Sequence, residues 1–258
     1  MLPRRTDCCE GPHRMKILAL WCHPRSMSTA FERVMRERGD LDVLHEPFMY
    51  HYYLAQPHRP FADFDPDPGH PRGYEAIRDM ILAEAKDRPV FFKDMAYYVL
   101  DRLPADPGFM GAVTHAFLIR DPAASIVSYH RRDPGFACAE VGLEGQWRLY
   151  CALRDAGHSA QIIRADDVRA DPAATMARYW SAVGLDDRPD ALSWDTAVPR
   201  GWESVADWHR DTLQSGAIRP PETGPDPRAE LAALGPPWTD YEAHHRPFYD
   251  ALCAEARP

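Results

Sequence analysis

The sequence has few features that would place the protein in a membrane or on a nucleic acid. No apolar run approaches the roughly 18 residues that a membrane-spanning helix needs, and no apolar segment of a secretory signal precedes residue 15. Acidic residues outnumber basic residues by 39 to 30, which gives a net charge of -9 at pH 7. That charge argues against a nucleic-acid partner but is compatible with a local basic pocket. We therefore expect a cytoplasmic protein with a loose tail over residues 1–14.

Metal-binding patterns are also missing. The six cysteines are scattered along the chain, and none stands in a CxxC or Cys/His spacing of the kind that binds zinc. In a cytoplasmic protein such cysteines are expected to be reduced thiols. The sequence therefore predicts no metal site.

The chain has 258 residues, 45% of them hydrophobic, and is long enough to form one large domain around a substantial core. Apolar segments typical of buried strands alternate with segments of helical periodicity. Strands are predicted at 15–22, 41–45, 89–93, 114–120 and 159–164, and helices at 29–38, 74–86, 139–156, 173–183 and 241–256.

The order of these segments predicts an α/β fold. Most of the strands are apolar throughout, which is typical of a parallel sheet covered by helices on both faces. We expect a single domain over residues 15–258 with a central, mainly parallel sheet. Residues 186–240 are rich in proline and lack long periodic runs, so we expect an irregular lid or wrapping segment there. In such sheets, ligands bind beyond the carboxyl ends of the strands.

The segment WCHPRSMSTAFERVM, residues 21–35, joins the first predicted strand to the first predicted helix. A strand, a polar turn and a helix N-terminus form a ready phosphate site, because the first N–H groups of the helix are unpaired and carry partial positive charge. Arg25 adds a guanidinium group, and Ser26, Ser28 and Thr29 add hydroxyl groups. A helix capped by serine or threonine without any ligand could have the same residues. The turn lacks the Gly-Lys-Ser/Thr signature of ATP and GTP hydrolases.

A second segment, FLIRDPAASIVSYHRR at residues 117–132, has a related pattern. Arg120 ends an apolar strand, and Ser128 follows eight residues later in a predicted helix. Asp121 and Pro122 suit the first positions of that helix. Arginine can bind a phosphate through two charge-assisted hydrogen bonds, and the serine adds a hydroxyl group. The alternative is an ion pair between Arg120 and a nearby carboxylate such as Asp121.

Together the two segments resemble the donor site of the bacterial sulfotransferases that depend on 3′-phosphoadenosine-5′-phosphosulfate (PAPS). PRSMSTA, residues 24–30, is similar to the loop that binds the 5′-phosphosulfate, with Met27 where glycine is more frequent. Arg120 and Ser128 are similar to the pair that binds the 3′-phosphate. Residues 162–185 resemble the late strand, acidic turn and Asp-Pro helix of the family. The resemblance implies a P-loop sulfotransferase fold.

The resemblance also implies a reaction and a set of donor-binding residues. A sulfonate group would move in line from PAPS to a hydroxyl group, or less readily an amine, of a small-molecule acceptor, and adenosine 3′,5′-bisphosphate (PAP) would be released. Near the C-terminus, Arg200-Gly201 is similar to a loop that returns to the 3′-phosphate in this family. The implied donor-binding residues are Arg25, Ser26, Met27, Ser28, Thr29, Ala30, Arg120, Ser128, Arg200 and Gly201.

Negative charge builds up on the leaving phosphate oxygen and on the transferred group, so cations there would stabilise the transition state. Arg25 and Lys93 are the candidates, and many family members have a lysine at a strand end like that of Lys93. The acceptor hydroxyl also needs a base. Glu46 is the predicted base, because other sulfotransferases use a glutamate after the first helix and Pro47 favours an extended backbone before it. The alternative is that Glu46 pairs with Lys93 or Arg25 and holds these cations in place.

Three other groups are alternatives to Glu46 as the base. Met95 stands where the animal cytosolic enzymes have their catalytic histidine, so that base has no counterpart here. Asp94, next to Lys93, is the other carboxylate candidate. His45 and His130 are lesser candidates, and surface or packing histidines are the alternative interpretation of both.

Aromatic residues are predicted to line the acceptor pocket. They cluster at residues 48–53, with Tyr97 and Tyr98 as further candidates. A wall of this kind favours an amphipathic or aromatic acceptor, although core packing would use the same residues. Trp202 and Trp208 have two interpretations, stacking on a base or substrate and packing of a lid against the core.

Two other functions remain open at this point. A kinase-like P-loop phosphotransferase would bind Mg²⁺, but the chain lacks Gly-Lys-Ser/Thr, and Asp94 is the one aspartate that would suit the metal. A noncatalytic nucleotide-binding protein could keep Arg120 and Ser128 without transferring any group. The sequence makes no prediction about the oligomeric state.

Overall fold

The computed structural model describes residues 16–56, 64–199, 202, 210–220 and 224–256. The predicted tail over residues 1–14, the Arg200-Gly201 pair and Trp208 lie outside these ranges. The described residues form one α/β unit around a sheet of five parallel strands, which confirms the predicted fold class.

The strands of this sheet follow the predicted order along the chain. Strands β1 and β3 are buried along their whole length, because helices cover both faces of the sheet. The edge strands β2 and β5 are only partly buried. The bounds are β1 (Ile17–Cys22), β2 (Asp42–His45), β3 (Val90–Met95), β4 (Val113–Ile119) and β5 (Ala160–Arg164), in the spatial order β2-β3-β1-β4-β5.

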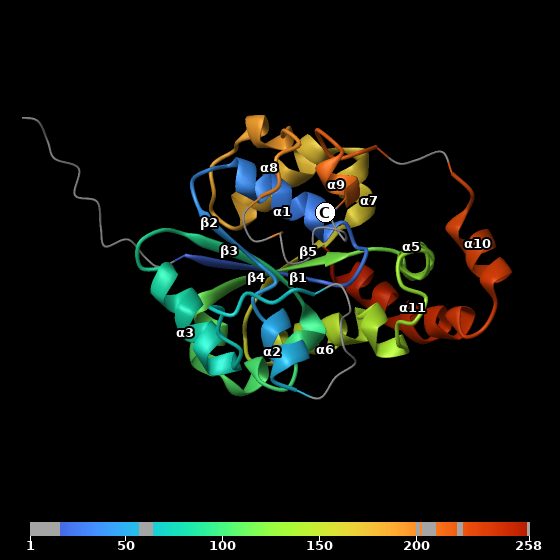
Figure 1. The fold of residues 1–258 in the computed structure, drawn as a ribbon, viewed down its shortest axis with the longest axis horizontal. Coiled ribbons are helices and arrows are strands. Elements are labelled where there is room, and N and C mark those ends of the chain that lie inside the picture. The colour runs from blue at the N-terminus through green and yellow to red at the C-terminus, as the bar shows by residue number, and fades with distance from the viewer. Residues whose placement is uncertain (1–15, 57–63, 200–201, 203–209, 221–223, 257–258) are drawn as a thin grey trace, which may run out of the picture.

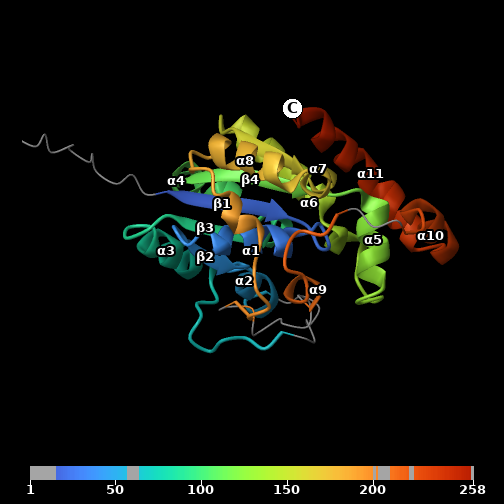
Figure 2. The same cartoon turned by 90° about the horizontal axis from the view of Figure 1, so that it is seen from above.

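Helices cover the two faces and one end of the sheet. Figure 1 shows α1, α7 and α8 on one side and α2, α3 and α6 on the other. Figure 2 shows α5, α10 and α11 together at one end, where they contact one another. The described helices are α1 (Ser28–Glu37), α2 (Met49–Leu54), α3 (Tyr74–Glu84), α4 (Pro107–Ala112), α5 (Pro122–His130), α6 (Leu143–Asp155), α7 (Ala165–Ala170), α8 (Pro172–Ala182), α9 (Arg210–Leu213), α10 (Pro227–Leu234) and α11 (Trp238–Glu255), with single 3-10 turns at Ala96–Tyr98, Leu103–Ala105, Cys138–Val141 and Pro189–Leu192.

The topology leaves a crevice next to the central strand. Strand β1 lies between β3 and β4. The chain leaves β1 towards the edge strand β2, and it leaves β4 towards the opposite edge strand β5. The loops after β1 and β4 therefore diverge beyond the carboxyl ends of the strands, which is where ligands bind in open α/β sheets.

Some boundaries differ from the predicted ones. Strand β3 continues past Lys93 to Met95, so Lys93 lies inside the strand rather than at its end. The helix predicted at 139–156 begins only at Leu143, after Gly142 with φ of 84°. A Cβ atom at Gly142 would lie 2.9 Å from the Cβ atom of His23, so the close approach of these two segments requires glycine.

The predicted elements do not include the short helices α2, α4 and α7. Each has six residues, too few for a helical pattern to repeat. Helix α7 replaces the acidic turn expected after β5, and α2 carries most of the aromatic cluster. The segment predicted as a lid, residues 186–240, contains α9 and α10 among its described residues.

Candidate active site

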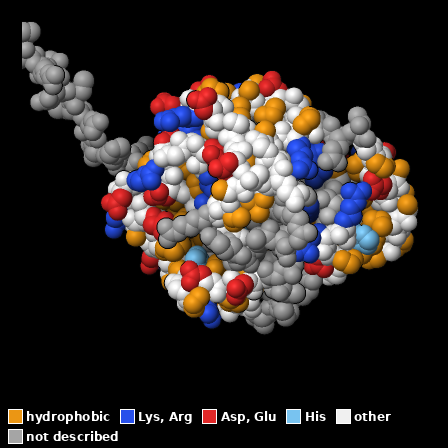
Figure 3. Space-filling model, turned by 45° about the horizontal axis from the view of Figure 1, so that its top comes forward, with side chains coloured by type: hydrophobic (Ala, Val, Ile, Leu, Met, Phe, Trp, Pro, Cys, Tyr) orange, Lys and Arg blue, Asp and Glu red, His pale blue; other side chains and the backbone are white. Residues whose placement is uncertain are grey.

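A cavity of about 970 Å³ opens beyond the carboxyl ends of β1, β2, β3 and β4. Its wall combines the loops after these strands with α7 and with residues from the predicted lid segment, such as Thr212 and Arg219. The molecular face in Figure 3 carries Lys and Arg side chains interspersed with Asp and Glu side chains. The described site residues that were predicted from the sequence and line this cavity are Arg25, Met27, Ser28, Thr29, Ala30, Glu46, Lys93, Arg120 and Ser128.

Backbone strain is concentrated at this cavity. Among the described non-glycine residues, φ is positive at Arg25 (62°), Met27 (73°) and Glu46 (42°), and all three line the cavity. Such conformations cost free energy and persist only where the surrounding structure holds them. Their position supports a functional role for the loops after β1 and β2.

Hydrogen bonds join the loop after β1 to the start of α5. The Arg120 guanidinium donates to the Arg25 carbonyl oxygen at 2.8 Å, and Arg25 Nε donates to Ser128 Oγ at 2.9 Å. The backbone N–H of Arg120 donates to His23 Nε2 at 3.1 Å. The two predicted phosphate motifs, 95 residues apart in the chain, therefore form one connected unit.

The alternative partner for Arg120 is engaged elsewhere. The Asp121 carboxylate accepts hydrogen bonds from the Ala123 N–H at 2.9 Å and from Arg246 at 2.8 Å, so it caps α5 and fixes it to α11. These contacts hold the pKa of Asp121 below its usual value against the opposing effect of burial. Arg120 therefore bonds to the loop after β1 through the Arg25 carbonyl oxygen.

Arg169 on α7 is a third arginine at this end of the cavity, and the sequence interpretation did not include it. Its Nε donates to the sulfur of Met27 at 2.9 Å. Burial, together with the positive charges of Arg169 and Arg25, lowers the pKa of Arg120 to about 10, although Asp166 and Asp121 oppose the shift. The arginine cluster, which we define as Arg25, Arg120 and Arg169, therefore has an excess of positive charge that an anion would offset.

Lys93 lies on the other side of the loop after β1. Its side chain is only 1% exposed, and Nζ is 2.5 Å from Glu46 Oε1 and 3.5 Å from Ser28 Oγ. Burial favours the neutral amine, but the charges of Glu46 and Glu32 outweigh it and hold the pKa of Lys93 above its usual value. The pairing that was the alternative interpretation of Glu46 is therefore present in this structure.

Glu32 on α1 was also not predicted as a site residue. The side chain is fully buried, with Oε2 at 2.6 Å from His45 Nδ1 and Oε1 at 2.7 Å from Trp202 Nε1. Arg36 pairs with the same carboxylate, and Lys93 Nζ is 3.9 Å from it. We define Glu32, His45, Glu46 and Lys93 as the lysine cluster.

The structure separates the alternative bases. Among the described residues, His45 lines the cavity but Asp94 and His130 do not. Asp94 Oδ2 accepts the Phe48 N–H at 2.9 Å, and burial raises the pKa of this carboxyl group well above its usual value. His130 packs its ring edge against Trp238. Asp94 therefore serves as a buried acceptor that holds the turn after β2.

The aromatic cluster is divided between the cavity and the core. Tyr53, Tyr97 and Tyr98 line the cavity, whereas Phe48 is completely buried in the core. Met49 and Met95 complete this apolar part of the wall. Trp202 is fully buried next to His45 and donates to Glu32, so it packs and holds the site rather than offering a face to a ligand.

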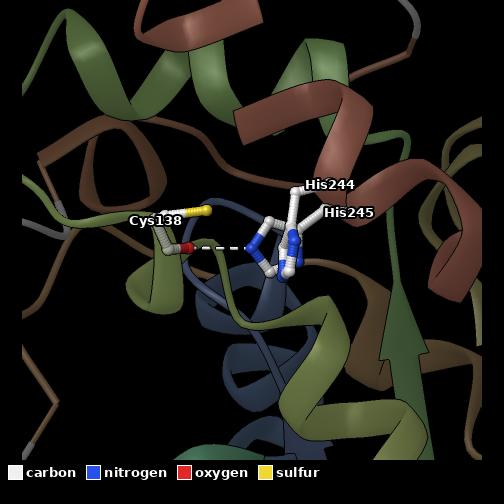
Figure 4. A group of neighbouring side chains, drawn as sticks. All are labelled: Cys138, His244 and His245. Carbon is white, nitrogen blue, oxygen red and sulfur yellow. Dashed lines mark hydrogen bonds between the residues drawn. The ribbon is translucent and has the colours of Figure 1, made fainter. Parts of the chain in front are cut away.

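Figure 4 shows Cys138, His244 and His245 close together, and none of the three lines the cavity. His245 Nε2 donates to the Cys138 carbonyl oxygen at 2.8 Å, while Nδ1 accepts the Glu144 N–H at 3.3 Å. Burial lowers the pKa of His245 to about 4. Both ring nitrogens already have backbone partners, so this histidine packs α11 against the start of α6 rather than offering a lone pair to a metal.

Comparison with known proteins places the chain among sulfotransferases. A family model described as "Sulfotransferase domain" matches residues 15–256. Two curated proteins of Arabidopsis thaliana, branched-chain-amino-acid aminotransferase-like proteins 2 and 1, are 26% and 23% identical over 214 and 212 residues. These matches cover 82% and 81% of this chain but 38% of each relative, so the chain spans well under half of their length.

Two solved structures have a similar fold. The sulfotransferase domain of the Synechococcus PCC 7002 olefin synthase has a TM-score of 0.52 at 15% identity, with 92% of this chain and 94% of that domain covered. The sulfotransferase domain from the curacin biosynthetic pathway has a TM-score of 0.50 at 11% identity, with 85% and 96% covered. No helix among the described residues is both long and apolar enough to cross a membrane. Since the family match extends over nearly the whole chain and the fold agrees with it, the chain belongs to the sulfotransferase domain family.

Proposed function

We propose that the chain transfers a sulfonate group from PAPS to a hydroxyl group, or less readily an amine, of a small acceptor and releases PAP. The observation that carries this proposal is the connected unit of Arg25, Arg120 and Ser128, with the buried Lys93 in the same cavity. A donor with phosphates at both the 5′ and the 3′ position needs two anion sites that are fixed relative to each other.

The residues of the cavity fit such a donor. The arginine cluster has excess positive charge, and the N-terminus of α1 adds backbone N–H groups beside it. Ser26 is fully buried and does not line the cavity, so the hydroxyl contact predicted for it would require a movement of the loop. We assign Arg25 to Ala30 to the 5′-phosphosulfate and Arg120 with Ser128 to the 3′-phosphate. Arg200 and Gly201 remain predictions outside the described residues.

Arg25, Lys93 and Glu46 are the proposed catalytic residues. Arg25 and Lys93 would offset the charge that develops on the leaving phosphate oxygen and on the transferred sulfonate group. Glu46 holds Lys93 through an ion pair of 2.5 Å and is the carboxylate that we assign to the acceptor hydroxyl. No step in this scheme uses a metal ion.

The acceptor side of the cavity favours a particular class of molecule. Tyr53, Tyr97 and Tyr98 form an apolar wall with Met49 and Met95 close to Glu46 and Lys93. A pocket of this type binds aromatic or amphipathic small molecules through stacking and apolar contacts, with few polar contacts to orient them. We propose such an acceptor and a cytoplasmic location, with no nucleic-acid partner.

Two experiments test the function. The purified chain is incubated with PAPS and a panel of alcohols, phenols, sugars and amines, and PAP formation is measured; Arg25→Ala and Glu46→Gln should abolish most of it. Thermal shifts should be larger with PAP than with AMP, since AMP lacks the 3′-phosphate. Equal shifts would contradict the assignment of Arg120. Binding of PAP without transfer to any acceptor would favour a nucleotide-binding protein, and Mg²⁺-dependent phosphate transfer from ATP would favour a kinase-like enzyme.

A further inference from the structure

We propose that His45 is a catalytic residue that receives the proton of the acceptor, and that Glu32 orients it and balances its charge. This inference rests on the proposed sulfonate transfer and deepens it. It adds to the site a histidine and a carboxylate that lie behind Glu46 and Lys93 and that bind no part of the donor.

The contact between Glu32 and His45 fixes the state of the imidazole ring. Glu32 Oε2 lies 2.6 Å from His45 Nδ1, and the His45 side chain is only 2% exposed. A carboxylate can only accept, so the proton of the neutral ring is on Nδ1 and Nε2 carries the lone pair. Histidine is an effective base when one ring nitrogen donates to a carboxylate and the other ring nitrogen faces the reacting group.

The carboxylate of Glu32 is itself held in place and charged. Arg36 binds Oε1 at 2.7 Å, and Trp202 Nε1 donates to the same oxygen at 2.7 Å. Burial acts to raise the pKa of Glu32, but the contacts with His45, Arg36 and Lys93 outweigh it and hold this pKa well below its usual value. Glu32 is therefore ionised at neutral pH and can balance an imidazolium that forms beside it.

The second ring nitrogen of His45 lies on the side of the reacting groups. Nε2 is 3.9 Å from Glu46 Oε1, the same oxygen that binds Lys93 at 2.5 Å, and both His45 and Glu46 line the cavity. A small rotation of either side chain would bring these two atoms within hydrogen-bond distance. The acceptor proton can thus arrive at Nε2 directly or through the Glu46 carboxyl group.

The proposed step conserves atoms and charge. As the acceptor oxygen forms its bond to sulfur, its O–H bond breaks and the proton ends on His45 Nε2. The bond between sulfur and the bridging phosphate oxygen breaks, and its electron pair stays on that oxygen beside Lys93 and Arg25. The imidazolium then returns its proton to water, which restores the neutral ring for the next turnover.

The charged groups around His45 are Glu32 and Arg36 from α1, Glu46 from the turn after β2, and Lys93 from β3. The proposed step requires a lone pair on Nε2 before each transfer. This ring nitrogen distinguishes the proposal from a base made only of Glu46.

The decisive variant is His45→Asn, because the asparagine amide can still donate to Glu32 but has no counterpart of Nε2. We expect kcat for sulfonate transfer to fall by about 100-fold or more, with the affinity for PAP changed less than about 3-fold. Free imidazole should restore part of the rate. Glu32→Gln, which keeps an acceptor oxygen but loses the charge, should lower kcat by about 10-fold, the lower end of the range for orienting groups.

Nitrogen NMR of the wild-type protein tests the geometry without any turnover. With ¹⁵N-labelled histidine, the neutral His45 should carry its proton on Nδ1, and Glu32→Gln should shift that proton upfield. A neutral ring protonated on Nε2 overturns the inference even if His45→Asn does not fold. A His45→Asn enzyme with the wild-type kcat overturns it as well. If the wild-type chain transfers no sulfonate at all, the proposed function fails instead.

Discussion

The two charged regions of the cavity differ in how their charges are balanced. In the lysine cluster, two carboxylates face Lys93, and Arg36 and His45 complete the pairing around Glu32. In the arginine cluster, three guanidinium groups lie close together, and the nearby carboxylate of Asp121 pairs with Arg246. In the lysine cluster the positive and negative charges of the protein balance one another, whereas the arginine cluster has an excess of positive charge.

The pKa shifts of Lys93 and Arg120 reflect this difference in charge balance. Surrounding carboxylates raise the pKa of Lys93 despite its burial, whereas burial and neighbouring cations lower the pKa of Arg120 to about 10. A compensated cluster keeps its geometry without a ligand, while an excess of one charge favours a ligand of the opposite charge. This difference supports our proposals that the phosphates bind at the arginine cluster and that the proton is transferred in the lysine cluster.

The largest effect should follow the loss of the cation in the compensated cluster. Lys93→Met should lower kcat by about 100- to 1,000-fold, as does the removal of a group that stabilises the developing charge. It should also lower the free energy of unfolding by about 3–5 kcal/mol, because Glu32 and Glu46 would keep buried charges without their cation. Steady-state kinetics and urea unfolding measure the two effects.

A matched double variant sharpens this prediction. Glu46→Gln added to Lys93→Met removes one of the two stranded carboxylates, so it should recover most of the lost stability but none of the lost activity. A Lys93→Met protein as stable as the wild type would contradict the description of this cluster as internally compensated.

Loss of a cation from the arginine cluster should act mainly on binding. Arg120→Ala should weaken the affinity for PAP by about 10- to 100-fold, corresponding to the loss of charged hydrogen bonds, and leave the affinity for AMP unchanged. Stability should change little, because relief of repulsion from Arg169 and Arg25 offsets the lost bond to the Arg25 carbonyl. Isothermal titration calorimetry measures both affinities, with Arg154→Ala on the surface as the control.

Asp94 offers a smaller, pH-dependent test of the turn that holds Glu46. Burial raises its pKa, so the native state binds a proton that the unfolded state releases above about pH 4. The contribution of Asp94 to the free energy of unfolding of the wild type therefore decreases as the pH rises above that value. The decrease continues until the pH reaches the pKa that Asp94 has in the folded protein. Asp94→Asn keeps the acceptor for the Phe48 N–H and should be more stable than the wild type at pH 7 by about 1 kcal/mol or more.

Two comparisons control the Asp94 prediction. The advantage of Asp94→Asn should disappear in unfolding curves measured at or below about pH 4, where the unfolded carboxyl group is also protonated. Asp94→Ala lacks the acceptor and should be less stable than Asp94→Asn at every pH by about 1–3 kcal/mol. Equal stability of wild type and Asp94→Asn across the range would show that Asp94 is ionised in the fold.

The smallest effect concerns the strained loop after β1. Met27→Ala and Met27→Gly both remove the sulfur that contacts Arg169, but only glycine relieves the left-handed backbone at φ of 73°. The glycine variant should therefore be more stable than the alanine variant by about 1 kcal/mol. Thermal unfolding of the pair measures it, and a more stable alanine variant would count against strain at this position.

Much of the fold could be predicted from local patterns. The apolar runs that became β1, β3 and β4 are buried on both faces, so their composition by itself indicates a parallel sheet. The Asp-Pro pairs mark the starts of α5 and α8 because aspartate caps the first N–H groups and proline needs none. Helices of six residues, such as α7, have too little pattern to be recognised.

Some residues of the candidate site could also be predicted from local sequence patterns. Arg25, Arg120 and Ser128 stand in motifs whose spacing indicates phosphate binding, and the structure brings them within hydrogen-bond distance. Arg169 was missed because its helix was missed, and Glu32 because a charged residue inside a predicted helix gives no sign that it is buried.

The sequence by itself determined the parallel sheet, the two predicted phosphate motifs and the family they resemble, because strand burial, helix capping and short motifs depend on residues that are close in the chain. The tertiary structure alone decided the partners of these residues. Glu46 meets Lys93 across 47 positions, and Arg169 reaches Met27 across 142. Such contacts depend on the order of the strands, which brings His45 and Lys93 to the Glu32 carboxylate on α1 and, with Arg36, holds its pKa below the usual value despite burial.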